Sequence, residues 1–202
     1  MQKNTAPTKG NLMSAKNTLR LSKQGYEMLD KKRNILIREM MQLIEEAKEI
    51  EAQIENLFAQ AYHALEAANM NISVRSVEEH AHCTSFDNSI QIDLRSVMGV
   101  ELPVIHIGKF NDRPAYGFAD TSSSLDEAFL KFNQVKQLTV KLAEIENSVY
   151  RLAVNIKKTQ KRANALENIT IPMYDGIVRD ITNSLEEKDR EEHSRLKVLK
   201  NR

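Results

Sequence analysis

Apolar residues recur alternately every three and four positions along the first third of the chain. From Leu12 to Ala68 the series has seventeen positions, and fifteen of them are apolar or aromatic, interrupted only by Ser22 and Arg33. A repeat of 3.5 residues held over roughly eight heptads predicts a coiled-coil helix. We call the residues of this repeat the seam. Its main members are Leu19, Tyr26, Leu29, Leu36, Met40, Leu43, Ile50, Ile54 and Leu57.

A helix of this length is on the order of 85 Å long and cannot cover its own apolar stripe, so a second long helix must lie along it. The residues from Thr121 to Glu127 predict its start, because serine and threonine caps precede acidic side chains. A second seam then runs through Leu138, Leu142, Ile145, Val149, Leu152, Ile156, Thr159, Ala163 and Leu166.

Beyond Leu166 the spacing changes to steps of about four residues, through Ile169, Met173, Ile177, Ile181 and Leu185. Such a spacing exceeds the 3.5-residue repeat, so we expect the supercoil to unwind or to change hand there. Pro172 falls in the same stretch and lacks a backbone N–H, which predicts a kink in the helix.

Glycine and proline interrupt the region between the two helical patterns. Three short strands are expected there, at residues 72–77, at Ser89–Leu94, where polar and apolar residues alternate, and at Val104–Ile107. The sequence therefore predicts a mainly α protein, a long antiparallel two-helix coiled coil with a small central β-containing knob. The expected segments are residues 1–69 for the N-terminal helix, 70–120 for the knob and 121–202 for the C-terminal helix.

Antiparallel pairing within one chain places Ala68 opposite Leu138 and Arg33 near Met173, and it brings the two termini to one tip. Arg33 then has two interpretations. Its aliphatic stem can reach to solvent, or its guanidinium can pair with Glu167 or Asp175 and fix the helix register.

Charge is distributed unevenly, although the net charge is only +1. Residues 1–33 and 188–202 are both basic, whereas residues 39–101 carry twelve acidic side chains against three basic ones. Opposite potentials along a rod favour different partners at its two ends. Candidate partner contacts are Lys9, Lys16, Arg20, Arg195 and Lys197, together with the run Lys157, Lys158, Lys161 and Arg162, which is either a solvated face or a surface for an acidic partner.

Little in the sequence predicts chemistry. His80, His82 and Cys83, with His106 as a further ligand, form a weak metal pattern, for which we expect a structural role instead. No phosphate-binding loop and no catalytic triad stand out, so we expect no catalytic residue, cofactor or metal. The single cysteine and the absence of a long apolar run favour a cytoplasmic protein without a membrane span.

Two classes of protein compete with a rod whose two ends bind different partners. A coiled coil that binds nucleic acid or serves as a scaffold through its basic tip is compatible with the charge. However, no aromatic residues are interleaved with the basic ones for base stacking, so nucleic acid is not expected. A free-standing enzyme is the third class, and the chain offers no constellation for it.

Several motifs nevertheless resemble one known family. The stretch Pro7–Leu12, the stretch Gly25–Arg33 leading into Leu36–Glu39, and Arg162–Glu167 followed by Ile171-Pro172 resemble the signatures of the D subunit of V-type and A-type rotary ATPases. Arg113–Phe118 also fits that pattern.

The resemblance implies a non-catalytic rotor shaft in the central stalk. Its helical tip would enter the ring of catalytic and regulatory ATPase subunits, and its other end, with the small F subunit, would sit on a funnel-shaped subunit above the membrane rotor ring. Ion transport would then be coupled to ATP hydrolysis or synthesis by rotation, with the chain peripheral to the membrane. The basic run would contact acidic loops of the ring or the F subunit.

Overall fold

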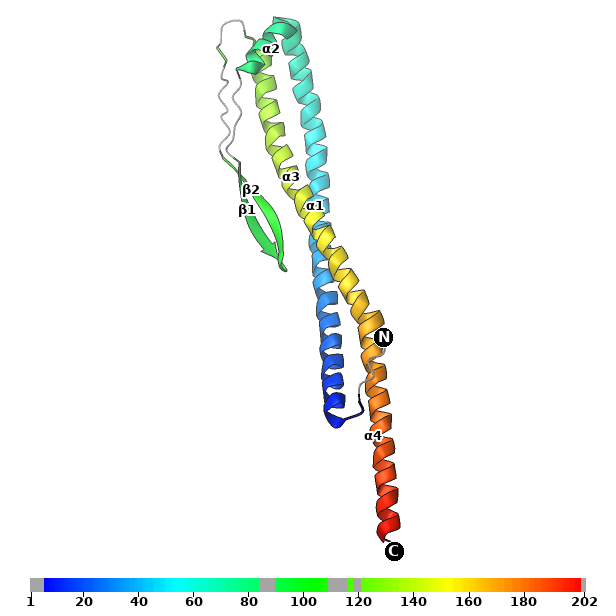
Figure 1. Cartoon of the computed structure of the whole chain (residues 1–202). Coiled ribbons are helices and arrows are strands. Elements are labelled where there is room, and N and C mark those ends of the chain that lie inside the picture. The colour runs from blue at the N-terminus through cyan, green and yellow to red at the C-terminus, as the bar shows by residue number, and fades with distance from the viewer. Residues whose placement is uncertain (1–5, 84–89, 109–115, 118–120, 201–202) are drawn as a thin grey trace. The chain divides into compact units, whose positions relative to one another are not determined.

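Helices dominate the computed structural model, which describes residues 6–83, 90–108, 116–117 and 121–200. In chain order the elements are helices α1 (Lys9–Ile72) and α2 (Val74–His82), strands β1 (Ile90–Val97) and β2 (Val100–Ile107), helix α3 (Ser123–Ala165), the π-helical segment η1 (Leu166–Thr170) and helix α4 (Ile171–Lys200) (Figure 1). The predicted fold class is confirmed, because two long helical stretches flank a small central sheet.

Contacts group the chain into two compact units. Unit 1 contains Met1–Ile35 and Ile156–Arg202, and unit 2 contains Leu36–Asn155. Each unit combines a length of α1 with a length of the C-terminal helical stretch, so helix pairing occurs within each unit.

In unit 2, α1 and α3 lie side by side and antiparallel (Figure 1). Lys131 Nζ donates to Gln60 Oε1 at 2.8 Å, and Asn71 Nδ2 donates to Ser124 Oγ at 3.1 Å. Ala68 packs with Leu125 and Tyr116 in a buried cluster. The predicted pairing of Ala68 with Leu138 is therefore wrong, and its partner lies thirteen residues earlier in the chain.

Both seams are shielded from solvent in the structure. All seventeen positions of the first series, from Leu12 to Ala68, and all nine of the second series, from Leu138 to Leu166, are buried or half-buried. The seam of α3 begins earlier than predicted, because Leu125, Ala128 and Val135 are also buried. Because Leu125, Ala128 and Val135 belong to the seam, α3 pairs with α1 in a register that is thirteen residues earlier than predicted.

The first predicted strand, at residues 72–77, is wrong. Helix α1 ends at Ile72, Ser73 adopts a φ of 107°, and helix α2 begins at Val74. The Ser73 hydroxyl accepts a hydrogen bond from the Ser76 N–H at 3.4 Å, which caps the new helix. Val74 and Val77 are three residues apart, and residues at this spacing lie on one face of a helix. The spacing therefore did not distinguish a helix from an irregular strand.

The other two predicted strands correspond to β1 and β2, which form an antiparallel hairpin. Ser89 lies outside the described residues. Met98 and Gly99 form a two-residue turn with φ values of 49° and 74°, the conformation that matches the twist of paired strands. Val100 and Leu102 are 3% exposed, so one face of the hairpin packs into unit 2.

Candidate functional site

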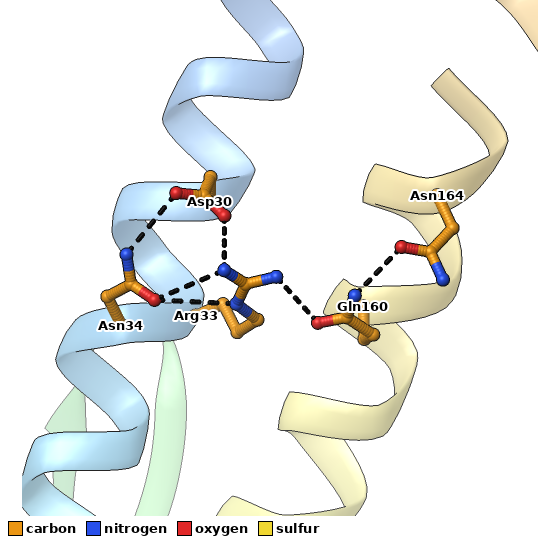
Figure 2. Close-up of polar contacts among 5 residues, drawn as sticks. All are labelled: Asp30, Arg33, Asn34, Gln160 and Asn164. Atoms are coloured by element: carbon orange, nitrogen blue, oxygen red, sulfur yellow. Dashed lines mark hydrogen bonds and ion pairs between the residues drawn. The ribbon is translucent and has the colours of Figure 1, made fainter. Parts of the chain in front are cut away.

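A layer of polar side chains crosses the seam of unit 1. Arg33 Nη1 donates to Gln160 Oε1 at 2.8 Å across the helix pair, and the same guanidinium forms an ion pair with Asp30 (Figure 2). Asn34 Nδ2 donates to Asp30 Oδ2 at 3.2 Å, and Gln160 Nε2 donates to Asn164 Oδ1 at 2.8 Å. The layer links one turn of α1 to one turn of α3. Its guanidinium, carboxylate and amide groups each need a donor or acceptor of matching type at hydrogen-bond distance.

The predicted partners of Arg33 are wrong. Its guanidinium contacts Asp30 and Gln160, whereas Asp175 pairs with Arg179 at 2.8 Å on its own helix. The partner across the pair again lies thirteen residues before the predicted Met173. Arg33 is half-buried, so its charge is held at the seam rather than extended freely into water.

A second polar contact lies two turns before Arg33 on α1. The Tyr26 hydroxyl lies beside the Glu167 carboxylate. The negative charge of Glu167, with smaller contributions from desolvation, from hydrogen bonding to Glu167 and from Asp30, raises the pKa of Tyr26 above its ordinary value. Glu167 thus has a partner on α1, but the partner is Tyr26 and not Arg33.

The helix that carries Glu167 widens at this point. In η1 the Ile171 N–H bonds to the Leu166 carbonyl, five residues earlier, and Thr170 Oγ1 donates to the Ala165 carbonyl at 3.3 Å. Pro172 follows directly after this turn, as the second residue of α4, and has no N–H to donate. The structure therefore continues the helix through Pro172 by means of a π-helical turn.

The wider turn changes which residues face α1. Ile169 and Met173, both predicted for the seam, are 66% and 46% exposed. Thr170 and Tyr174 are half-buried instead, and Ile181 is buried as predicted. The additional residue per turn of a π segment accounts for this displacement of the seam.

The C-terminal end of α4 extends beyond the paired helices of unit 1 (Figure 1). Leu185 is half-buried, and every residue from 186 to 200 is exposed. The earlier register leaves residues 186–200 without an α1 counterpart, and the termini that were predicted to meet at one tip, residues 1–5 and 201–202, lie outside the described residues. Arg195 pairs with Glu191 at 3.6 Å on the same helix, and Lys197 is exposed.

The basic run on α3 is a solvent-exposed surface. Lys157, Lys158, Lys161 and Arg162 are all exposed, and none has a carboxylate within ion-pairing distance among the described residues. On α1 the candidate contacts Lys9, Lys16 and Arg20 are exposed as well. Unit 1 thus combines a polar seam with uncompensated positive charge on its surface.

Comparison with known proteins decides the family. Residues 11–201 match the family model described as the ATP synthase D subunit. The chain is 45% identical over 195 residues to the V-type ATP synthase D subunit of Thermotoga neapolitana, with 96% of each chain covered. It is 35% identical to the A-type ATP synthase D subunit of Methanopyrus kandleri, covering 96% of this chain and 84% of the relative. The chain belongs to the family of ATP synthase D subunits. The resemblance predicted from the motifs is confirmed.

The two helical motifs of that resemblance meet in unit 1. Gly25–Arg33 lies on α1, and Arg162–Glu167 spans the end of α3 and the start of η1. A methyl group placed on Gly25 would lie 3.7 Å from Leu166 Cδ1, and Tyr26 contacts Glu167. Of the third motif, residues 113–115 and 118 lie outside the described residues, while Tyr116 is buried. The two helical motifs on which the resemblance rests therefore meet across the helix pair of this chain.

The remaining candidates lie in unit 2. His80 and His82 are on helix α2, and Cys83 follows it. His80 packs 5.6 Å from the ring of Tyr116, and His106 pairs with Asp93 at 3.2 Å. Across the described ranges, no helix is both long and apolar enough to cross a bilayer.

Sequence reasoning missed two features of the site. Gln160 was not singled out, although it lies one residue from Thr159 on the seam and so faces α1 obliquely. The π-helical turn was also missed. The change to steps of four residues was its visible signal, because an inserted residue lengthens the local repeat.

Proposed function

We propose that this chain is the central rotor shaft of a V-type or A-type ATP synthase, and that it carries no catalytic residue. The proposed role is to couple ATP hydrolysis or synthesis in a ring of catalytic and regulatory subunits to rotation of the membrane ion-translocating ring. The small F subunit of the stalk and the funnel-shaped subunit above the rotor ring are the other proposed partners. The chain would be cytoplasmic and peripheral to the membrane through this assembly.

The observation that supports the proposal best is the pairing of two continuous helices along both units. The described helices bury seams on facing sides, and the polar layer of Arg33 and Gln160 resists sliding of one helix along the other. A shaft needs this resistance, because torque is transmitted only if its two helices turn together. Membership of the family of ATP synthase D subunits supports the same role.

Two surfaces are proposed as contacts with the surrounding ring. One is the exposed end of α4, residues 186–200, which includes Arg195 and Lys197. The other is the basic run, which we propose binds acidic loops of the ring or the F subunit. Neither surface is needed to bury the seams, so each can be altered without unfolding the helix pair.

Truncation tests the first surface. A chain that ends at Leu185 should unfold within about 0.5 kcal/mol of the full chain, because the removed residues are exposed. In a reconstituted ATP synthase the same chain should lose coupling between ATP hydrolysis and ion pumping. Retained coupling with the truncated chain would contradict the proposal for this end.

Charge reversal tests the second surface. Lys161→Glu combined with Arg162→Glu should weaken assembly or coupling, since it replaces two exposed positive charges by negative ones. The matched control is Lys23→Glu with Lys31→Glu, which reverses two exposed charges of α1 that are not candidate contacts. Equal loss in both variants would indicate a general charge effect, and unchanged ATPase activity and pumping in the first would dismiss the run as a contact.

A further inference from the structure

The two outer edges of the β-hairpin differ. On β2, the Glu101 carbonyl accepts a hydrogen bond from Arg151 Nη1 at 3.1 Å, and the Ile105 N–H donates to Glu144 Oε2 at 3.0 Å. Pro103, between them, has no N–H to satisfy. Side chains of α3 therefore close the outer edge of β2.

The register shows which groups of β1 point outward. In an antiparallel pair, residues alternate between those that exchange backbone hydrogen bonds and those that point away. Glu101 and Ile105 point to α3, so their partners Ser96 and Ile92 point away from β2 on the opposite edge, as does Leu94, the partner of Pro103. Within the described ranges, the outward N–H and C=O groups of these β1 residues have no protein partner.

Exposed apolar side chains border this open edge of β1. Ile90, Ile92 and Leu94 are 41%, 64% and 60% exposed and share one face of β1. Protected edge strands usually carry proline, lysine or a bulge at such positions, and β1 has none of these. An open backbone edge bordered by apolar side chains is suited to pairing with another strand.

The opposite face of the hairpin anchors this edge and adds charge. Arg95 Nη2 pairs with Glu39 of α1 at 2.7 Å, and the buried Leu102 lies across from Arg95. Asp93 and Arg95 are still mostly exposed at their side chains. A strand added to this edge would therefore meet one acid and one base two residues apart.

We propose that the open edge of β1 binds an extended segment of another protein as a third, antiparallel strand. The segment would carry apolar residues at alternate positions against Ile92 and Leu94, an acidic residue opposite Arg95 and a basic residue opposite Asp93. This inference goes beyond the proposed function, because it rests on the hairpin and its contacts with α1 and α3 and does not depend on a rotor role.

A synthetic peptide tests the geometry on the full chain. The probe is Thr-Val-Glu-Val-Lys-Val-Thr, in which the order of Glu and Lys matches Arg95 and Asp93 in an antiparallel arrangement. Binding should slow amide exchange at Ile92, Leu94 and Ser96 at least tenfold, measured by NMR, and should leave Asp93 and Arg95 unchanged because they already bond to β2. A peptide with Glu and Lys exchanged should bind more weakly.

Two controls separate strand pairing from unspecific apolar contact. The same peptide with N-methyl groups on its first two valines cannot donate to β1 and should lose at least tenfold in affinity. Leu94→Pro removes one outward N–H of the chain and should also weaken binding at least tenfold, whereas Leu94→Val keeps that N–H and should bind within threefold of the unaltered chain.

Three results would overturn the proposal. Equal affinity of the N-methylated peptide would exclude pairing through the backbone. Slow exchange at Ile92 and Leu94 in the free chain at all concentrations would show that the edge is already closed. Protection that grows with protein concentration would assign the edge to a second copy of the chain.

Discussion

The two units bury their helix seams with different side chains. Unit 2 contains both of the large side chains that are fully buried in the described structure, Leu36 and Leu152. In unit 1 the buried apolar residues are Ala15, Ala163 and Ile181, and the polar layer of Arg33 and Gln160 crosses the seam. The difference indicates that unit 2 supplies most of the stability, while unit 1 fixes the helix register through specific partners.

The largest change in the free energy of unfolding is expected when the apolar seam of unit 2 is disrupted. Leu152→Ala should lower the free energy of unfolding by about 2 to 5 kcal/mol, because a fully buried side chain is replaced by a cavity. Urea unfolding measures the loss. Leu130→Ala, at an exposed position of the same helix, is the control and should cost less than about 1 kcal/mol. Equal losses would contradict the assignment of stability to the buried seam.

The polar layer of unit 1 should contribute less to stability and more to register. Arg33→Leu removes the guanidinium that pairs with Asp30 and donates to Gln160. We therefore expect the free energy of unfolding in urea to fall by about 1 kcal/mol. Arg20→Leu, at an exposed position of the same helix, should be nearly neutral. Cysteine cross-linking across the pair should yield more than one register in Arg33→Leu and a single one in Arg20→Leu; a single register in both would show that the layer does not fix it.

Alkaline pH should affect unit 2 through Tyr116. Its hydroxyl donates to Asp126 Oδ1 at 2.8 Å, and burial, followed by this hydrogen bond and the charge of Asp126, raises the pKa of Tyr116 well above its ordinary value of 10.0. The unfolded chain therefore loses the Tyr116 proton first, and the free energy of unfolding should fall as pH rises above about 10.

The matched variant is Tyr116→Phe, which keeps the ring and removes the titrating hydroxyl. It should cost about 1 kcal/mol at neutral pH, and its unfolding free energy should fall less steeply above pH of about 10. Unfolding in denaturant at several pH values measures both. Parallel curves for the two proteins would assign the alkaline loss to other groups.

The smallest effect is expected at the proline of unit 1. Pro172→Ala should change the unfolding free energy by less than about 1 kcal/mol, because the π-helical turn before Pro172 already accommodates its missing N–H. NMR exchange of the Ile171 amide should still report the bond to the Leu166 carbonyl. Loss of that protection would mean that the proline, and not the seam, maintains the π-helical turn.

Periodicity made the helices and most seam positions predictable, since apolar spacing records which face of a helix is covered. The register was not predictable in the same way. On α3 the seam advances from Phe132 to Val135 and again to Leu138, two successive steps of three residues, so the regular series appeared to begin at Leu138. The capping residues correctly predicted that the helix starts near Ser123. Aligning that start with the end of α1 would have predicted the register better than the apolar series did.

Polar contacts across the helices were harder to predict than apolar ones. An apolar seam follows a repeat, whereas the partner of Arg33 depends on the register and on which polar group is within hydrogen-bond reach. The alternating pattern of β1 likewise predicted a strand but not its open edge, because edge groups depend on which residues of α3 meet β2. The residue types alone therefore do not predict the partner of Arg33 or the open edge of β1.

Disulfide trapping in unit 1 tests whether one chain folds back on itself in the observed register. In a Cys83→Ser background, Ser22→Cys with Thr170→Cys places two cysteines at half-buried seam positions that face each other in this register. We predict an intrachain disulfide in that protein and none in the pair Ser22→Cys with Asn183→Cys. A bond in the second pair only, or disulfides between two molecules in the first, would contradict the fold-back and the shaft built on it.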